Sequence, residues 1–242
     1  IASYFEKIEV RKNDRGFCTI TGYYKGHRIS IISTGIGADN IDIVMNELDA
    51  LVNINLHTKE IKKEKKTLNI VRIGTSGSVQ ADVPVHSFVI SEMSLGIDGV
   101  LRFYRDNEMV CDTAFEEAFI KECHWTPLAA RPYAVKASPK LVDKLHTEGV
   151  TVKGVTLTAN GFYGPQGRVL RLPIEMPTVN DEIARFRFGN YKIVNYEMES
   201  AAIAGLAALM GHQATTICLI IANRANGDAS ANYKPHMKKL IE

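Results

Sequence analysis

One stretch near the end of the chain restricts the possible fold more than any other. Residues 215–222 read Thr-Thr-Ile-Cys-Leu-Ile-Ile-Ala, an almost continuous apolar run without alternating polar side chains. Such a run is typical of a strand at the centre of a sheet that is covered on both faces. Residues 197–210, just before it, have apolar residues at helical spacing and are followed by Gly211, which predicts a helix that ends there.

Strands and helices are expected to alternate along the rest of the chain. This alternation predicts an α/β fold with a mostly parallel or mixed sheet, and residues 101–131 are expected to form a loop and a helix outside that sheet. No linker or internal repeat is visible, so a single domain over residues 1–242 is predicted. Strands are expected at residues 28–33, 68–73, 85–91, 151–158 and 191–195, and helices at 39–51 with Asp39 as N-cap, 138–149 and 178–188.

Composition excludes several classes of protein. The chain has 242 residues, of which 45% are hydrophobic and 23% charged, as in a globular protein with a substantial core. A net charge of +2 is too small to indicate a nucleic-acid or membrane partner. Neither a signal peptide nor a transmembrane run of about 18 residues is visible. The first residue is Ile1 rather than Met, so we expect that N-terminal residues are missing.

The cysteines indicate a reducing compartment. All four are scattered, and no Cys-x-x-Cys pair occurs, which predicts free structural thiols and a cytoplasmic location. Cys123 and His124 are the only adjacent residues of metal-binding type, and no partner lies at ligand spacing. No metal site is therefore predicted.

Two carboxylates flank a thioether in the segment Asn-Tyr-Glu-Met-Glu-Ser at residues 195–200. Glu197 and Glu199 offer acceptors for hydroxyl groups, and Met198 offers an apolar surface for the face of a sugar. Acidic residues are also common in the first turn of a helix, because the helix N-terminus is electropositive. Taken alone, the segment is compatible with either explanation.

Two further segments follow expected strands and combine glycine with polar side chains. In Arg-Ile-Gly-Thr-Ser-Gly at residues 72–77, Arg72 offers a bidentate fork, and backbone amides with the Thr75 and Ser76 hydroxyls can hold phosphate oxygens. The segment is not a Walker A motif, and a tight turn with an ion-paired arginine is the structural alternative.

The loop at residues 162–168 reads Phe-Tyr-Gly-Pro-Gln-Gly-Arg. Phe162 can stack on a planar ring, and Gln166 offers a donor and an acceptor that match an imide edge. Arg168 can donate to a carbonyl oxygen and stabilise negative charge that develops on the ring. An ordinary surface loop is the alternative. The apolar strand likewise ends in Ile-Ile-Ala-Asn-Arg at 220–224, where Arg224 could serve a structural ion pair.

These segments occur together in an order that resembles the nucleoside phosphorylases of the uridine phosphorylase type. The resemblance spans about residues 15–224 and is carried by Ser-Thr-Gly-Ile-Gly at 33–37, residues 72–77, the 162–168 loop, residues 195–200 and Asn223-Arg224. It implies a three-layer phosphorylase/hydrolase-like α/β fold with a central, mixed, partly closed sheet flanked by helices. It also implies homodimers, commonly grouped into a hexamer, and no cofactor, with inorganic phosphate as a co-substrate.

The resemblance assigns roles to particular residues. Arg72 and Thr75 would bind phosphate, and Arg15 would reach the phosphate site of a neighbouring subunit. Glu199 would accept hydrogen bonds from the ribose hydroxyls, with Met198 against the sugar. The residues implied in nucleoside binding are Thr75, Ser76, Gly77, Phe162, Gln166, Arg168, Glu197, Met198, Glu199, Ile221, Ala222 and Arg224, and those implied in catalysis are Arg72, Gln166, Arg168 and Glu199.

The reaction implied is reversible phosphorolysis of uridine in pyrimidine salvage, with deoxyuridine and thymidine as further candidates. Phe162, Ile221 and Ala222 would pack on the base, Gln166 and Arg168 would contact the uracil edge, and Arg224 would position the loop. Breaking the glycosidic bond places positive charge on ribose and negative charge on the base, so phosphate and Arg168 would stabilise the transition state without a strong general acid.

The chain departs from the family pattern at several positions. An early Gly-Asp-Pro-x-Arg phosphate segment and an N-terminal histidine that contacts a neighbour's ribose are absent. Gly16 stands where some bacterial members have a glutamate that binds a monovalent cation, so that cation is not predicted. Residues 102–131 match poorly and could change access to the site.

Three alternative functions remain open at this stage. Purine nucleoside phosphorylases use an aspartate, usually after a serine near the end of the central strand, to protonate the purine, whereas this end of the chain reads Ile-Ala-Asn-Arg at 221–224 and has no such Ser-Asp pair. A nucleoside hydrolase would use water and would not need Arg15 together with Arg72. A non-catalytic nucleoside-binding protein would not need a phosphate site at all.

Overall fold

The computed structural model describes residues 1–242 and divides into two compact units. The first comprises Ile1–Ile36 with Ile241, and the second comprises Gly37–Leu240 with Glu242. No helix in the structure is long and apolar enough to cross a membrane.

The first unit is a three-stranded antiparallel sheet. After a short 3-10 helix, Ala2–Tyr4, the strands are β1 (Lys7–Asp14), β2 (Phe17–Tyr24) and β3 (His27–Ser33). Both connections are two-residue turns, Arg15-Gly16 and Lys25-Gly26, in which all four residues have positive φ. This conformation fits a type I′ turn, whose twist matches that of paired strands. Strand β3 was predicted from the sequence, whereas β1 and β2 were not.

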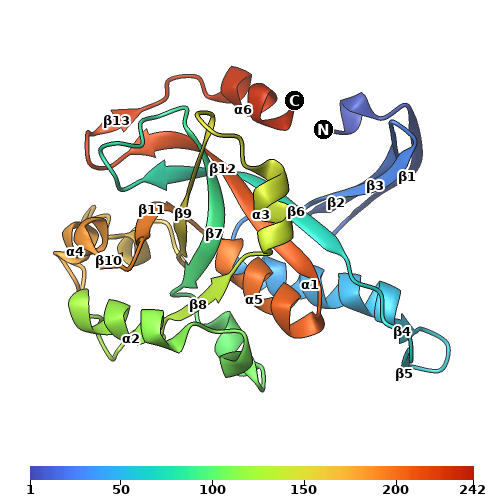
Figure 1. Ribbon diagram of the computed structural model, residues 1–242, viewed down its shortest axis with the longest axis horizontal. Helices are drawn as coiled ribbons and strands as arrows, with labels where there is room; N and C mark the ends of the chain where they lie inside the picture. Colours follow the sequence, from blue (N-terminus) through green and yellow to red (C-terminus); the bar gives the residue numbers. More distant parts are fainter. The chain divides into compact units, whose positions relative to one another are not determined.

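The second unit is built on an eight-stranded mixed sheet (Figure 1). Its order is β13-β12-β6-β11-β9-β7-β8, with β10 added on β11, and β12 also pairs with β7. That extra pairing closes the central strands on one another, as the family resemblance implied. The strands are β6 (Asn69–Ser78), β7 (Phe88–Gly96), β8 (Tyr133–Lys136), β9 (Thr151–Thr158), β10 (Arg187–Phe188), β11 (Tyr191–Glu197), β12 (Gln213–Asn223) and β13 (Asp228–Ala229).

Helices flank this sheet and complete the α/β fold. One apolar cluster joins α1 and α5, with Ile41, Met45 and Leu206 fully buried; another joins α2 and α4 to the sheet through Phe115 and Ile183. A separate pair, β4 (Ile54–Asn55) and β5 (Glu60–Ile61), follows α1. The helices are α1 (Ala38–Asn53), α2 (Thr113–Glu122), α3 (Pro139–Leu145), α4 (Val179–Arg185), α5 (Ser200–Met210) and α6 (Lys234–Ile241), with 3-10 turns at Val100–Phe103, Asn107–Met109 and Gly164–Gln166.

The main elements agree with the sequence predictions, but several boundaries differ. The N-cap of α1 is Gly37 rather than Asp39. Helix α3 ends at Leu145, earlier than expected, and the predicted 178–188 helix stops at Arg185 before β10. Residues 101–131 form turns and α2 outside the sheet, as predicted. Strand β8 and helix α6 were not predicted from the sequence.

Two boundary differences affect the functional residues. Gly74 to Gly77 do not form a turn but continue strand β6 to Ser78, because each is paired in parallel register with β12. Glu197 is the last residue of β11 rather than the start of a helix, since it pairs with Thr158 of β9, and α5 begins only at Ser200. Pairing with strands distant in sequence overrides the local helical pattern.

Candidate active site

An arginine and two glutamates form a buried cluster where β11 leads into α5. Arg72 Nη1 lies 3.1 Å from Glu197 Oε2, and Arg72 Nη2 donates to Glu199 Oε2. Both glutamates are only 4% exposed. Burial lowers the pKa of Arg72, but the two carboxylates and the contact with Cys218 outweigh burial and raise the pKa above its ordinary value. Arg72 is therefore cationic at all physiological pH values.

Glu197 makes more contacts with the protein than Glu199 does. Its Oε1 accepts from Thr158 Oγ1 at 2.5 Å, and its Oε2 accepts from the backbone N–H groups of Glu199 and Ser200 at 2.9 and 2.8 Å. Oε2 also forms the ion pair with Arg72, so three of the four contacts fall on Oε2, and Oε1, with two acceptor positions, accepts one bond. Burial, only partly offset by Arg72, raises the pKa of Glu197 to about 7. Glu197 thus anchors Arg72 and the start of α5.

Glu199 retains more capacity for a ligand. Its Oε1 accepts from the Gly37 backbone N–H at 2.7 Å, and its Oε2 contacts Arg72. About two acceptor positions are left, enough for a pair of hydroxyl groups. Gly37 has φ 105°, a conformation that favours glycine, and a Cβ there would meet Asp39 Oδ1 at 2.6 Å. Met198, between the two glutamates, is half-buried.

Strand β6 gives Arg72 the space it occupies. A Cβ on Gly74 would stand 2.6 Å from Arg72 Nη1 and 2.8 Å from its Cζ, so the guanidinium lies directly against the Gly74 backbone. Arg72 has five N–H donors, and the contacts with Glu197, Glu199 and Cys218 leave some of them for an anion. Thr75, also assigned to phosphate, is half-buried on the same strand.

Ser76 does not take the position that the sequence predicts. Its side chain is buried, and its Oγ accepts from Asn195 Nδ2 at 2.8 Å. Asn195 Oδ1 accepts in turn from Thr156 Oγ1 at 2.9 Å. Successive residues of a strand face opposite sides, so the half-buried Thr75 and the buried Ser76 point in opposite directions. The Ser76 hydroxyl therefore belongs to a buried polar network rather than to an open anion site.

A second polar cluster gathers around Gln166. This residue is 3% exposed, and its Oε1 accepts from Arg168 Nη1 at 2.6 Å and from Arg224 Nη2 at 2.5 Å. Arg224 Nη1 also donates to the Gln166 backbone carbonyl at 2.5 Å. Both acceptor positions of the amide oxygen are used, so Gln166 can present only its Nε2–H donors to a ligand. The donor-and-acceptor pairing expected from the sequence is thereby reduced to a donor.

The aromatic and apolar residues predicted to contact a base surround this cluster. Phe162 is 53% exposed, and Arg168 Cζ lies 3.9 Å from the centre of its ring, so the ring stacks on a guanidinium. Ile221 and Ala222 are half-buried near the end of β12, where Ile221 interrupts the register with β6. Burial lowers the pKa of Arg168, and burial followed by the proximity of Arg168 lowers the pKa of Arg224 to about 10.

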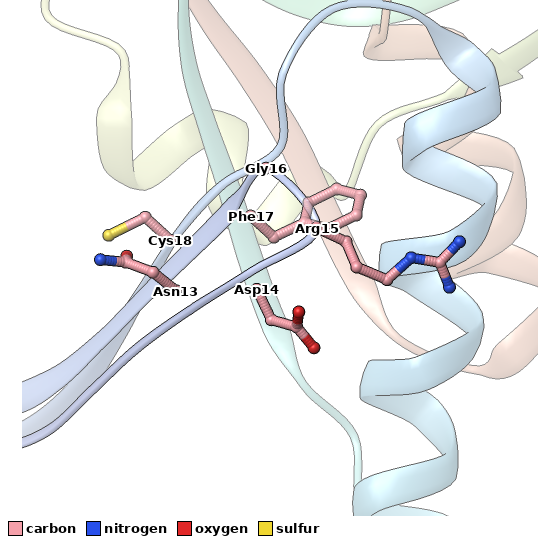
Figure 2. A pocket seen from close by; sticks show the side chains of 6 residues that line it. All are labelled: Asn13, Asp14, Arg15, Gly16, Phe17 and Cys18. Carbon is pink, nitrogen blue, oxygen red and sulfur yellow. The ribbon is translucent and has the colours of Figure 1, made fainter.

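Arg15 belongs to the first unit. It lies at the β1–β2 turn with φ 47°, in a hollow lined by residues 13–18 (Figure 2). In Figure 2 its side chain extends away from the hairpin, on the side opposite Asn13 and Cys18. Its assignment to a neighbouring subunit's phosphate site stays a prediction.

Three contributors to the two clusters were not assigned from the sequence. The Gly37 N–H and the Thr158 hydroxyl bind the glutamates, and the Tyr196 ring lies 4.4 Å from Arg224 Cζ. Gly37 and Tyr196 lie within quoted segments, residues 33–37 and 195–200, but neither was given a role of its own, and Thr158 lies in no quoted motif. Thr158 and Tyr196 look like ordinary strand residues until β9 and β11 are paired.

Asn223 has a structural role at the end of β12. Its Nδ2 donates to the backbone carbonyls of Gln80 and Val83 at 3.0 and 2.9 Å, and its Oδ1 accepts from the N–H groups of Ala225 and Asn226. All its donors and acceptors are used, and an amide cannot supply a proton as a carboxylic acid does. Asn223 is not available as a general acid.

The two clusters are joined by neighbouring residues of one strand. Glu197 and Tyr196, at the end of β11, contact Arg72 and Arg224 respectively. The cluster around Arg72 therefore combines a cation with Glu199, a carboxylate that retains acceptor capacity. The cluster around Gln166 combines two guanidinium groups with an amide donor. The arrangement can hold an anion and hydroxyl groups beside a ring that gains negative charge.

The sequence and structure were compared with known proteins. The family model described as the Phosphorylase superfamily matches residues 1–241. DeoD-type purine nucleoside phosphorylases of Caldanaerobacter subterraneus subsp. tengcongensis and Listeria welshimeri are 28% and 26% identical over 222 and 219 residues, covering 90% of this chain and 74% and 73% of those proteins.

Similar structures come from two eukaryotes. A Trypanosoma brucei nucleoside phosphorylase, whose structure is described as showing uridine phosphorylase activity, has a TM-score of 0.86 at 25% identity, covering 99% of this chain and 85% of that one. A uridine phosphorylase of Phytophthora capsici shares the fold with a TM-score of 0.64 at 22% identity, covering 99% and 80%. With one family model matching nearly its entire length, the chain belongs to the phosphorylase superfamily, as an enzyme of the nucleoside phosphorylase kind.

Proposed function

We propose that this protein catalyses the reversible phosphorolysis of uridine, giving uracil and ribose 1-phosphate. Deoxyuridine and thymidine are candidate substrates of the same site. The proposal places the enzyme in cytoplasmic pyrimidine salvage, with inorganic phosphate as co-substrate and no cofactor.

The observation that carries the choice of base is the cluster around Gln166. Arg168 and Arg224 both donate to Gln166 Oε1, which leaves the Gln166 Nε2 donor and further arginine donors for a ligand. Uracil has two carbonyl oxygens that accept such bonds, and both gain negative charge as the base leaves. Arg168 and Arg224 share one neutral acceptor, so they stabilise the negatively charged leaving base more than the neutral base of the bound nucleoside.

The Arg72 cluster supplies the other two binding functions. Phosphate is assigned to the remaining donors of Arg72 and to Thr75, and the ribose hydroxyls to the free acceptor positions of Glu199, with Met198 against the sugar. In the reaction, the C1′–N1 bond breaks with its electron pair moving to uracil, and a phosphate oxygen forms the new bond to C1′. Holding phosphate and sugar together supplies part of the rate enhancement.

Purine phosphorolysis is the second candidate, because DeoD-type purine nucleoside phosphorylases are among the similar sequences. Against it stands the end of β12, which reads Ile-Ala-Asn-Arg at 221–224 and contains no aspartate to protonate a purine ring. The T. brucei nucleoside phosphorylase, described as showing uridine phosphorylase activity, has a similar structure, with a TM-score of 0.86. These points favour uridine.

Base release from uridine, deoxyuridine, thymidine and inosine, measured with and without phosphate, tests the proposal. We expect uracil release from uridine that requires phosphate and yields ribose 1-phosphate. Equal release of uracil without phosphate would mean a hydrolase, and faster release of hypoxanthine from inosine would mean a purine phosphorylase. Arg168→Ala should lose much more activity than Lys63→Ala, whose side chain is exposed and forms no hydrogen bond or ion pair with either cluster.

A further inference from the structure

Arg168 and Arg224 are held close together without a carboxylate partner. Both donate to Gln166 Oε1, at 2.6 and 2.5 Å, and neither forms an ion pair. Two like charges that share one neutral acceptor repel each other, and burial weakens the screening of that repulsion by water. Something other than an anion must hold each guanidinium in place.

Each guanidinium lies against an aromatic face. Arg168 Cζ is 3.9 Å from the centre of the Phe162 ring, and Arg224 Cζ is 4.4 Å from the centre of the Tyr196 ring. The two rings differ in their surroundings, since Phe162 is 53% exposed and Tyr196 is 2% exposed. A cation–π contact is stronger when it is desolvated, so the Tyr196 contact is the stronger of the two.

Tyr196 contacts Arg224 through its ring and not through its hydroxyl. The hydroxyl is buried and has no hydrogen-bond partner, and Arg224 Nε likewise has none. On the neighbouring strand β6, Gly77 pairs with Tyr196, and a Cβ on Gly77 would lie 3.7 Å from Arg224 Nε. The flat ring and the adjacent glycine leave a narrow space that fits a planar guanidinium.

We infer that Tyr196 is a positioning residue, whose ring face holds Arg224 against Gln166 and thereby directs the Gln166 Nε2 donor at the base. The inference rests on the proposed function for its kinetic consequence, but not for its geometry. Arg224 contacts both the backbone carbonyl and the amide oxygen of Gln166, so displacement of Arg224 releases the amide to rotate. A rotated amide would present an oxygen where a uracil carbonyl requires a donor.

The kinetic test compares Tyr196→Phe with Tyr196→Leu. The phenylalanine keeps the ring and removes a hydroxyl that has no partner, so it should retain wild-type kinetics and thermal stability. The leucine removes the ring, and kcat/KM for uridine should fall about 5- to 30-fold, the range of a desolvated cation–π contact. The KM for phosphate should not change, because Arg72 is held by Glu197 and Glu199.

Tyr191→Leu is the matched control. Tyr191 lies on the same strand, β11, and its ring packs edge-on against Phe115 with the centroids 6.2 Å apart, away from both clusters. This variant should lose stability and keep wild-type kinetics with uridine. This control distinguishes a general destabilisation of β11 from the specific loss of the contact between Tyr196 and Arg224.

A second measurement needs no substrate. In the wild-type protein and in Tyr196→Phe, the ring current should shift the side-chain N–H resonances of Arg224 upfield, with assignment from Arg224→Lys. In Tyr196→Leu that shift should disappear. If Tyr196→Leu is too unstable to study, Arg224→Lys replaces it in the kinetic test, since lysine keeps the charge and loses the planar group.

The outcomes separate the two proposals. A ring-current shift in the wild type together with selective kinetic loss in Tyr196→Leu supports the inference. Equal losses in Tyr196→Phe and Tyr196→Leu would assign the effect to the hydroxyl and overturn it, as would an Arg224 resonance that is identical in all three proteins. If the wild type does not cleave uridine, the proposed function fails, while the resonance comparison still decides whether Tyr196 positions Arg224.

Discussion

The two glutamates of the 195–200 segment have different roles although they are two positions apart. Glu197 has four partners, Arg72, Thr158 and two backbone N–H groups, whereas Glu199 has only Arg72 and Gly37. Acceptor capacity, and not charge, distinguishes a structural carboxylate from one that can bind hydroxyl groups. The sequence of the segment allows two explanations, a helix start with acidic residues and a site for hydroxyl groups. Both apply, because Glu197 binds the start of α5 and Glu199 has free acceptor positions.

Glu197 should make the stability of the protein depend on pH. Its pKa is raised from 4.5 to about 7 in the folded state, so the folded protein holds a proton that the unfolded chain has already released between these values. The free energy of unfolding should therefore decrease as pH rises from about 5 to 7. Glu197→Gln should remove this decrease, as measured by urea unfolding at several pH values.

The control for this measurement is Glu117→Gln. Glu117 is exposed on α2 and is paired with Arg131, so its replacement should leave the pH dependence of the wild type unchanged. A Glu197→Gln variant with the wild-type slope would show that Glu197 is already ionised in the folded protein throughout this range.

Among the elements, β6 contributes most to the candidate site. It was predicted to end at residue 73, but pairing with β12 extends it to Ser78. The extension places Gly74 under the Arg72 guanidinium and turns the Ser76 side chain toward buried Asn195. In the sequence, these glycines suggest a flexible turn. In the structure, their lack of a side chain lets a guanidinium and a neighbouring strand approach the backbone of β6 closely.

Gly74→Ala tests this account of β6. The new Cβ would overlap the Arg72 guanidinium, which Glu197 and Glu199 prevent from moving freely. We expect the KM for phosphate to increase about 10-fold or more, the cost of one weakened charge-assisted hydrogen bond. Val71→Ala, an exposed substitution on the same strand, should leave this KM unchanged. An unaltered KM in Gly74→Ala would exclude Arg72 from phosphate binding.

For the assembled protein, the open question is whether Arg15 acts between subunits. It lies on the first unit, at a hairpin turn, and the family resemblance assigns it to a neighbour's phosphate site. If so, Arg15→Ala and Arg168→Ala should each be nearly inactive alone. Mixed after dissociation and reassembly, they should recover activity, because a mixed dimer contains one site with both arginines intact.

Failure of the mixture to recover activity, with mixed dimers present, would place Arg15 in its own subunit's site or in none. Mixing each variant with Arg11→Ala serves as the control. Arg11 lies on β1, four residues before Arg15, and is exposed, so a mixture containing Arg11→Ala should show only the activity of the Arg11→Ala protein.

Much of this protein is determined by short-range sequence patterns. The apolar run before Asn223, the helix ended by Gly211 and the alternation of strands and helices predict the α/β fold, because periodicity and glycine conformations act over a few residues. The ordered motifs also indicate a nucleoside phosphorylase. The residue types suited to binding phosphate, sugar and base can be named without a structure, since their chemistry is local.

Only the tertiary structure decides what those residues can offer to a ligand. The Gly37 N–H donates to Glu199 across 162 residues of sequence, and Arg224 donates to the Gln166 amide oxygen across 58 residues. These contacts leave Glu199 with free acceptor positions and restrict Gln166 to donating. No pattern in the sequence contains this information, because the remaining hydrogen-bonding capacity of a side chain depends on which distant strands and loops the fold brings against it.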